Sequence, residues 1–326
     1  MSDKTVSLQR IARHTATSNR RNNNLMTPIK KRPPRRPGKE HTYTVKEPAL
    51  LLDFLIATMS DKSRTTVKSY LSHRQVAVNG IATTKFNIPL HKGDQVTINF
   101  TRGYRLFQHK RLRIIYEDEY LIVIEKGYGL LSIATQNQKT ETAYRIVSDY
   151  VKRDDPEAHI FIVHRLDRDT SGVMIFAKRQ GIQETMQRNW DKTVQERKYI
   201  AIVQGTIEPA QGQIRSYLKE NAAMQMYSTP NAADGQLAIT HYKTIASNTR
   251  FSMVEIQLET GRKNQIRVHM HDTGHPIIGD RKYGSTCNPL GRVALHAATI
   301  RFIHPITKQQ LFFESAIPPR FEQIVK

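Results

Sequence analysis

The pattern with the most chemical content in this chain is the string HRLDRDTSG, from His164 to Gly172. It places one carboxylate, Asp167, between Arg165 and Arg168. A carboxylate beside guanidinium groups stays ionised, and the same arginines can bind phosphate. The string therefore indicates chemistry on a phosphate-bearing substrate. From these residues alone, an aspartate that braces its own loop through Arg165 is an equal alternative.

A second carboxylate, Asp169, follows two positions after Asp167. Two carboxylates that cleave a glycosidic bond flank it, about 5 Å apart in retaining enzymes and farther apart in inverting ones. Neighbours on one segment seldom do so. We therefore interpret Asp169, Thr170 and Ser171 as turn and capping residues. Gly172 would supply the backbone freedom that the turn needs.

Tyr199 lies in the string ERKYIAIVQG, which predicts a β-strand shortly after the aspartate motif. A tyrosine ring can stack on a nucleic-acid base while its hydroxyl handles a proton. In isolation, a tyrosine of the hydrophobic core would look the same.

A third string, LETGRKNQIRVHMHDTGHPIIGDRKYG, contains a predicted helix over residues 262–273. Thr260 suits the N-cap of this helix, and Gly274 suits its end. Side chains four residues apart would share one face of the helix. Those on the basic face are Lys263, Arg267 and His271.

The charge of the chain indicates a polyanionic partner. Its 326 residues carry a formal net charge of +21. A protein so basic usually binds RNA or DNA. Residues 1–40 hold eleven lysines and arginines against two carboxylates, and the remainder of the chain is also basic. Both parts should be attracted to phosphate.

Other classes of site are disfavoured by what the sequence lacks. Cys287 is the only cysteine, which excludes a disulfide framework and Cys-based zinc clusters. The zinc string HExxH and the phosphate-binding string GxxxxGK[ST] are absent, and GYG at 127–129 lacks the third glycine of a dinucleotide site. We expect no metal and no cofactor. With no secretory signal and no apolar run near 20 residues, we expect a cytoplasmic protein without a membrane partner.

The first segment, residues 1–45, is predicted to be a disordered basic arm. It contains RRNNN and KKRPPRRPGK and few large apolar side chains, so burial cannot offset the entropy of ordering it. An arm that binds RNA without sequence preference is favoured over a merely solubilising tail.

Residues 46–105 are predicted to form a small α+β domain. LLDFLIATM and residues 64–73 have helical spacing, VAVNGI predicts a hairpin that turns at Asn79 and Gly80, and GDQVTINF predicts a further strand. The second helix and its end would carry basic side chains toward solvent. These are Arg64, Lys68 and Arg74.

Residues 110–326 are predicted to form a larger α+β domain, with helices packed on a mostly antiparallel sheet. RLRIIYEDEYLIVIEK predicts two strands around a turn, and ETAYRIVSDYVKR predicts an amphipathic helix. Six further strands are predicted at VMIFAK, KYIAIVQG, AITHYKTI, FSMVEIQLE, TIRFI and QLFFES.

These strings, in this order, resemble the motifs of the RluA-type family of RNA pseudouridine synthases. HRLDRDTSG resembles the central motif of the family, ERKYIAIVQG its second motif, and the string around Arg267 its third. The likeness extends over most of residues 50–326, and residues 46–105 resemble the small RNA-binding domain that many of these enzymes share with a ribosomal small-subunit protein. It implies the pseudouridine synthase fold and isomerisation of uridine to pseudouridine without a cofactor.

The resemblance also implies roles for residues of the site. Asp167 would be the catalytic residue, Tyr199 the platform for the base, and Arg267 the partner of the aspartate. Arg165 would help to displace and hold the target nucleotide. Further RNA-binding residues are expected to be Arg168, Arg262, Lys263, Arg64, Lys68 and Arg74. The chain departs from the family pattern at Asn264, usually His, and at residues 126–129, usually Lys-Pro-Ala-Gly.

Large-subunit ribosomal RNA is the expected substrate, because this architecture is common among the ribosomal enzymes of the family, and tRNA is the alternative. Two rival functions remain at this point. One is a non-catalytic RNA-binding or ribosome-assembly protein that retains the fold. The other is a glycosidase acting on nucleic acid, which would need a second carboxylate facing Asp167 across the sugar. Nothing in the sequence demands more than a monomer.

Overall fold

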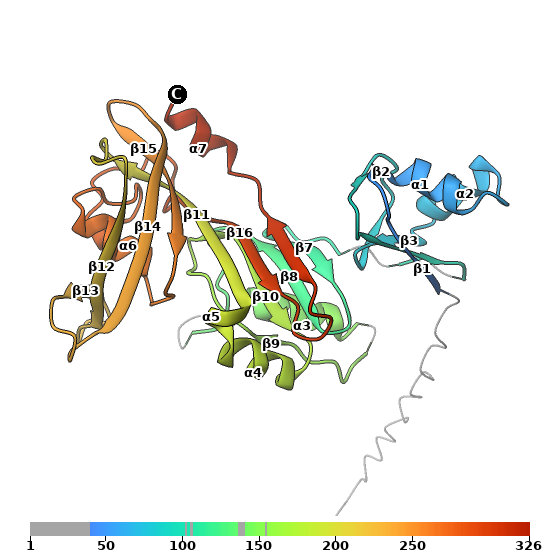
Figure 1. Cartoon of the computed structure of the whole chain (residues 1–326), viewed down its shortest axis with the longest axis horizontal. Helices are drawn as coiled ribbons and strands as arrows, with labels where there is room; N and C mark the ends of the chain where they lie inside the picture. The colour runs from blue at the N-terminus through green and yellow to red at the C-terminus, as the bar shows by residue number, and fades with distance from the viewer. Residues whose placement is uncertain (1–39, 102, 105–106, 136–140, 154) are drawn as a thin grey trace, which may run out of the picture. The chain divides into compact units, whose positions relative to one another are not determined.

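The computed structural model describes residues 40–101, 103–104, 107–135, 141–153 and 155–326 (Figure 1). Most of the predicted basic arm, residues 1–39, lies outside the described residues. Its last residues were assigned wrongly, because Glu40–Thr44 form strand β1. This strand pairs antiparallel with β6, Gln95–Asn99. The alternating polar sequence EHTYT has little apolar content, so composition alone could not separate it from the arm.

The first folded part contains the helices and the β-hairpin predicted for it. Its helices are α1, Leu51–Thr58, and α2, Arg64–Ser72, and its sheet has the order β1-β6-β3-β4. The remaining strands are β2 Ala49–Leu50, β3 Val76–Val78, β4 Ile81–Thr83 and β5 Pro89–Leu90. The hairpin between β3 and β4 turns at Asn79 and Gly80, both with positive φ, as this turn type requires.

The basic residues predicted on this small domain are exposed. Arg64 and Lys68 lie on α2, where Ser63 caps the helix by accepting a hydrogen bond from the Thr66 amide at 3.2 Å. Arg74 follows the helix in a left-handed conformation, with φ 61°. All three side chains can therefore contact a polyanion from solvent.

The larger part is built on one eleven-stranded sheet (Figure 1). Nine of the strands follow the order β13-β12-β14-β15-β11-β16-β10-β8-β7, with β17 paired to β16 and β9 to β10. Pairing is antiparallel except between β10 and β16. The strands are β7 Leu112–Glu117, β8 Leu121–Lys126, β9 Phe161–Ile162, β10 Ser171–Ala177, β11 Val194–Gln204, β12 Gln211–Glu220, β13 Met226–Thr229, β14 Gln236–Ser247, β15 Phe251–Leu258, β16 Leu295–Ile303 and β17 Gln310–Glu314.

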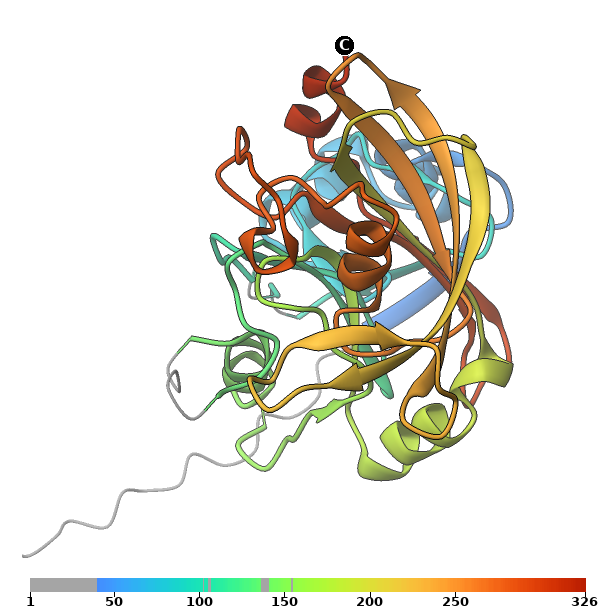
Figure 2. The ribbon, with the colours of Figure 1, turned by 90° about the vertical axis from the view of Figure 1, so that its left-hand side faces the viewer.

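Helices pack on this sheet and complete its hydrophobic core. They are α3 Ala143–Val151, α4 Gln180–Arg188, α5 Trp190–Thr193, α6 Gln265–Asp272 and α7 Pro319–Ile324, with a 3-10 turn, η1, at Arg281–Tyr283. Figure 2 shows the strong twist of the sheet, with α6 inside the curve of its strands. The helix α6 contacts β13 and β14, and α5 contacts β11.

The fold class is α+β with a mostly antiparallel sheet, as predicted. All six strands predicted after the aspartate motif are present. Three strands of this sheet were not predicted: β9 has only two residues, and β12 and β13 contain few large apolar side chains. No helix in the described ranges is long and apolar enough to cross a membrane.

Candidate active site

Asp167 lies in the short segment between β9 and β10, and neighbouring backbone fixes its position. The Ser132 hydroxyl donates to the Leu166 carbonyl at 2.6 Å and accepts from the Leu166 amide at 3.1 Å. The Thr170 amide donates to the Asp167 carbonyl at 3.2 Å, which closes a turn directly after the carboxylate. Because Leu166 is buried, the adjacent Asp167 side chain is held at the edge of the core.

Gly172 ends this turn at a position that no other residue fits. Its φ is +115°, and a Cβ added there would lie 2.1 Å from the Ala297 carbonyl oxygen. The contact arises because β10 begins as a parallel neighbour of β16, with Gly172 opposite Ala297. The predicted need for backbone freedom at Gly172 is confirmed, and its cause is the approach of two strands.

Tyr199 lies on β11, as predicted. It faces Ile256 of β15 on one side and Ala297 of β16 on the other, at a register shift between Lys198 and Tyr199. The side chain is half-buried, and burial raises the pKa of the Tyr199 hydroxyl. At neutral pH this hydroxyl is therefore a hydrogen-bond donor rather than a phenolate.

Arg267, on α6, binds two carboxylates unequally. Its Nε and Nη2 donate to Asp280 at 2.6 and 2.7 Å, whereas its Nη1 lies 3.5 Å from Oδ2 of Asp167. The predicted contact with Asp167 is present, but the stronger partner is Asp280, which is only 1% exposed. Burial alone would lower the pKa of Arg267, but the hydrogen bonds and charge of Asp280 outweigh burial and raise it.

Two further side chains complete the surroundings of the Arg267 guanidinium. Asn264 Oδ1 accepts from its Nη1 at 3.2 Å, and Asn264 Nδ2 donates to the Tyr283 hydroxyl at 3.0 Å. The Tyr283 ring lies against the guanidinium, 4.8 Å from ring centroid to Cζ. Asn264, which we noted as a departure from the family pattern, is therefore a direct contact of Arg267.

The helix carrying Arg267 starts later than predicted. It begins at Gln265 because Asn264 has a φ of 53°, in the left-handed region, and Thr260 caps no helix. Thr260 instead donates to the Gln265 side chain at 2.8 Å. Lys263 consequently lies before the helix and does not share the face of Arg267. The predicted end of the helix, with Thr273 as C-cap and a positive φ at Gly274, is confirmed.

Two of the predicted RNA-binding residues have other partners. Lys263 forms an ion pair with Glu220. Arg168 does not flank Asp167 as an anion-binding partner, because its guanidinium turns to Asp169, with an Nε to Oδ1 distance of 3.3 Å. Asp169 is thus paired with its neighbour.

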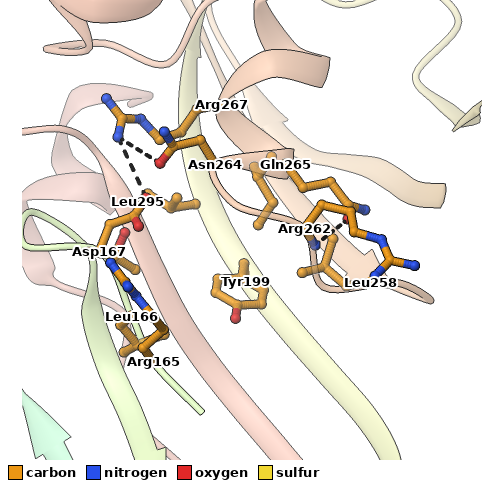
Figure 3. Close-up of a pocket in the computed structure, with 12 residues that line it drawn as sticks. Arg165, Leu166, Asp167, Tyr199, Leu258, Arg262, Asn264, Gln265, Arg267 and Leu295 are labelled. Atoms are coloured by element: carbon orange, nitrogen blue, oxygen red, sulfur yellow. Dashed lines mark hydrogen bonds and ion pairs between the residues drawn. The ribbon is translucent and has the colours of Figure 1, made fainter. Parts of the chain in front are cut away.

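A pocket gathers the central residues of the site (Figure 3). Asp167, Tyr199 and Arg267 line it together with Arg165 and Arg262, and Figure 3 shows Asp167 near the Arg267 guanidinium and Tyr199 on the strand beside them. Apolar side chains form the rest of the wall, namely Leu166, Leu258, Ile266 and Leu295. A planar, uncharged base could lie against such a wall while its sugar and phosphate face the charged groups.

The carboxylates at the site test the alternative that the protein is a glycosidase. Among the side chains that line this pocket in the described part of the chain, Asp167 carries the only carboxylate. Asp280 does not line the pocket, and both its oxygens accept hydrogen bonds from Arg267. The described residues thus offer no free second carboxylate to activate water across the sugar, which disfavours a glycosidase.

The contacts that Asp280 and Lys126 make at the site were not predicted from the sequence. Asp280 stands in GDRKYG, at the end of the string that carries Arg267, and a second carboxylate so near was the available signal. The Lys126 ammonium is buried, and it donates to the carbonyls of Leu130 at 2.8 Å and of Gly127 and Arg168 at 3.2 Å. Burial lowers the pKa of Lys126 to about 7. Lys126 thereby ties the segment after β8 to the aspartate motif.

Comparison with known proteins gives one consistent result. Residues 120–272 match the sequence model of a family described as RNA pseudouridylate synthase. An uncharacterised RNA pseudouridine synthase of Bacillus subtilis, YhcT, is 30% identical over 294 residues, which cover 89% of this chain and 97% of YhcT. Ribosomal large subunit pseudouridine synthase D of Vibrio cholerae is 32% identical over 299 residues, covering 86% of this chain and 92% of that protein.

Two more similarities extend the comparison. The tRNA pseudouridine synthase C of Haemophilus ducreyi is 34% identical over 237 residues, covering 65% of this chain and 94% of that protein. Among solved structures, the human protein RNA pseudouridylate synthase domain containing 4 superposes with a TM-score of 0.53 at 24% identity, covering 64% of this chain and 90% of that chain. The last similarity concerns the fold alone.

Proposed function

The chain belongs to the RNA pseudouridylate synthase family, and from this premise we propose that it isomerises uridine in ribosomal RNA with Asp167 as the catalytic carboxylate. The protein is an RNA pseudouridine synthase, so the reaction type follows from the family. What we propose beyond the family is the class of RNA and the role of each residue.

The reaction rearranges one nucleotide without a change of oxidation state. The bond from uracil N1 to ribose C1′ breaks, the base turns, and a bond from C5 to C1′ forms. The proton on C5 leaves to water, and N1 takes a proton. The site must therefore supply one carboxylate beside the sugar and a pocket with a surface for the detached base.

The observation that carries the proposal is the position of Asp167. Its carboxylate lines a pocket in which Arg267 lies 3.5 Å away and Tyr199 forms part of the wall. Arg267 helps to direct the carboxylate into the pocket. The Tyr199 ring offers a platform for uracil, and its protonated hydroxyl can donate to the base. One such carboxylate can react in three ways: it can attack the base, attack the sugar, or remove a proton from the sugar.

Ribosomal RNA is favoured over tRNA by the extent of the alignments. The ribosomal enzyme of Vibrio cholerae aligns over 86% of this chain, whereas the tRNA enzyme of Haemophilus ducreyi aligns over 65%. A small domain with an exposed basic helix before the catalytic part adds phosphate contacts that a large folded RNA can use. A non-catalytic assembly protein would need the basic surface but not the Asp167 pocket.

The proposal is tested by tritium release from RNA labelled at C5 of uridine. Equal molar amounts of labelled ribosomal RNA transcripts and labelled tRNA transcripts are incubated with the full-length protein. We expect release from ribosomal RNA and little from tRNA. Release from tRNA alone would refute the choice of RNA class. No release from either RNA, from protein shown to bind both, would refute the activity.

A further inference from the structure

A second pocket adjoins the site described above. It has a volume of about 380 Å³ and shares the side chains of Arg165, Tyr199, Leu258 and Arg262 with the Asp167 pocket. Its far side is formed by other residues, among them Trp190 and Arg197. We call this cavity the flanking pocket. Tyr199 and Arg165 belong to both pockets, so a chain of nucleotides could pass from one to the other without leaving the protein surface.

Of the arginines around the flanking pocket, Arg165 and Arg262 line both cavities, whereas Arg197 lines the flanking pocket together with Asp191, whose charge acts on it. Among the described residues, no carboxylate lies within ion-pair distance of Arg165, Arg197 or Arg262. Arg197 donates only to backbone carbonyls, at 3.2 Å to Glu259 and 3.5 Å to Leu258, and Arg262 donates to the Leu237 carbonyl at 2.9 Å. Arg165 and Arg262, at the junction of the two cavities, therefore form a site for anions.

Two nearby basic residues differ from these arginines, because each forms an ion pair. Arg168 pairs with Asp169 and Lys263 pairs with Glu220, and neither Arg168 nor Lys263 lines the flanking pocket. Arg165 and Arg262, which line both cavities, have no ion pair among the described residues, whereas Arg267 in the Asp167 pocket is paired with Asp280. Arg165 and Arg262 are exposed and can bind phosphate, which favours a phosphate-bearing ligand that spans both cavities.

An aromatic wall makes the flanking pocket suitable for a base. Trp190 is half-buried at the start of α5, with the His164 ring 5.1 Å and the Arg197 guanidinium 5.7 Å from the centroid of its ring. The indole also packs against the buried apolar cluster that contains Val163 and Met186, which holds it in place. Unpaired bases stack on aromatic rings and on guanidinium planes with little sequence preference. The pocket therefore provides a stacking surface beside phosphate-binding groups.

We propose that the flanking pocket binds the base of the nucleotide next to the target uridine, with the shared arginines on the phosphate between the two. This inference rests on the proposed function, because it takes the Asp167 pocket as the place of the target uridine. The enzyme then requires two unpaired nucleotides in succession rather than one. Its substrates are confined to loops, bulges and single strands.

The test uses Trp190 as its own reporter, because it is the only tryptophan in the chain. Two RNA stem-loops share a stem and a seven-nucleotide loop with uridine at the centre. In the first, both neighbours of the central uridine are also uridines; in the second, those neighbours are abasic ribose. All other loop positions are abasic in both RNAs. The protein is full-length Asp167→Asn, so no turnover occurs during the binding measurement.

We expect the first RNA to bind about tenfold more tightly than the second, the amount that one base–aromatic stack contributes. It should also quench the emission of Trp190, and the second RNA should leave that emission unchanged. Equal affinities with equal quenching would overturn the proposal. So would stronger quenching by the second RNA, because the target base itself would then occupy the flanking pocket.

Variants separate stacking from a general loss of folding. Trp190→Leu should remove the tenfold difference between the two RNAs, and Trp190→Phe should retain it. Arg179→Gln serves as a matched control, because Arg179 is exposed and pairs with Glu119 away from both pockets. If Trp190→Leu keeps the full difference while its thermal midpoint is unchanged, the inference fails. Tritium release by the wild-type protein is a separate readout, so the proposed function can stand when the inference falls.

Discussion

Arg267 and Asp280 are joined by two hydrogen bonds, of 2.6 and 2.7 Å, and this buried pair fixes the guanidinium that faces Asp167. Asp280 occupies Nε and Nη2, so Nη1 is the nitrogen left for Asp167 and Asn264. A guanidinium held on one edge cannot swing away when substrate enters. Asp280, which does not line the pocket, therefore helps to set the orientation of Asp167.

Asp280→Asn should lower kcat more than it weakens RNA binding. We expect a fall in kcat of about tenfold to hundredfold, because a misplaced Arg267 no longer directs Asp167, and a dissociation constant within about threefold of wild type. Single-turnover tritium release and filter binding measure the two effects. Asp149→Asn is the control, since Asp149 is exposed and pairs with Arg145 on α3. Equal losses in both measurements would show that Asp280 supports folding alone.

Gly172→Ala should destabilise the protein severely. The added Cβ would lie 2.1 Å from the Ala297 carbonyl at a φ of +115°, so the free energy of unfolding should fall by more than about 2 kcal/mol. Gly181→Ala is the matched control, because Gly181 lies in α4 with open space around it and no positive φ. That variant should gain about 0.5–1 kcal/mol. Urea unfolding checks both, and equal stabilities for the two variants would contradict the strand contact.

Acidification should destabilise the protein through buried neutral histidines. Burial lowers the pKa of His269 to about 4 and that of His164 to about 3, from 6.5. The unfolded chain therefore binds protons that the folded chain does not, and stability is lost as the pH falls from 6.5 toward 4. At pH 4.5, His269 alone should cost about 2–3 kcal/mol.

The comparison of His269→Gln with wild type isolates this contribution. Urea unfolding at pH 7 and pH 4.5 should show a smaller loss for the variant, because glutamine can still bond Thr240 and Ser216, the partners of His269, at 2.8 and 3.0 Å. His91→Gln should match wild type, since the His91 side chain is 78% exposed. The same acid loss in all three proteins would place the effect elsewhere.

The salt dependence of RNA binding should distinguish basic residues without an ion-pair partner from a basic residue that has one. Replacement of Arg165 or Arg262 by Gln should flatten the slope of log affinity against log salt by about 0.7, the value for one single-strand phosphate contact. Lys263→Gln should flatten it by less than half as much, because Lys263 is engaged by Glu220. Titrations from 50 to 300 mM salt, about the range in which counterion release dominates, measure the slopes. Indistinguishable slopes would contradict the assignment of free charges.

The sequence predicted those features that depend on short strings. HRLDRDTSG located Asp167 and the turn at Gly172, the Asn79–Gly80 pair located a hairpin, and the alternation around Tyr199 located β11. In each case the local residue types restrict the backbone to one conformation, such as positive φ at a glycine.

Features that depend on contacts across the fold were not predictable in this way. Two carboxylates, Asp167 and Asp280, were available to Arg267, and only the packing of α6 against the sheet decides which binds it more closely. The helix α6 starts at Gln265 and not at the predicted residue 262, because the side chains of Asn264 and Gln265 make contacts that compete with a regular N-cap. Arg168 pairs with its sequence neighbour Asp169 and not with Asp167. The side-chain rotamer decides between the two carboxylates, and residue spacing does not determine the rotamer.

The most direct test of Asp167 as the catalytic carboxylate compares it with its neighbour Asp169. Asp167→Asn and Asp169→Asn differ by two positions on one loop, but only Asp167 lines the pocket, and Asp169 pairs with Arg168. The measurement is single-turnover release of tritium from C5-labelled ribosomal RNA. The account predicts a rate about 10³-fold or more below wild type for Asp167→Asn, and a rate within about threefold of wild type for Asp169→Asn. Release by Asp167→Asn within about tenfold of wild type, or equal loss in both variants, would contradict it.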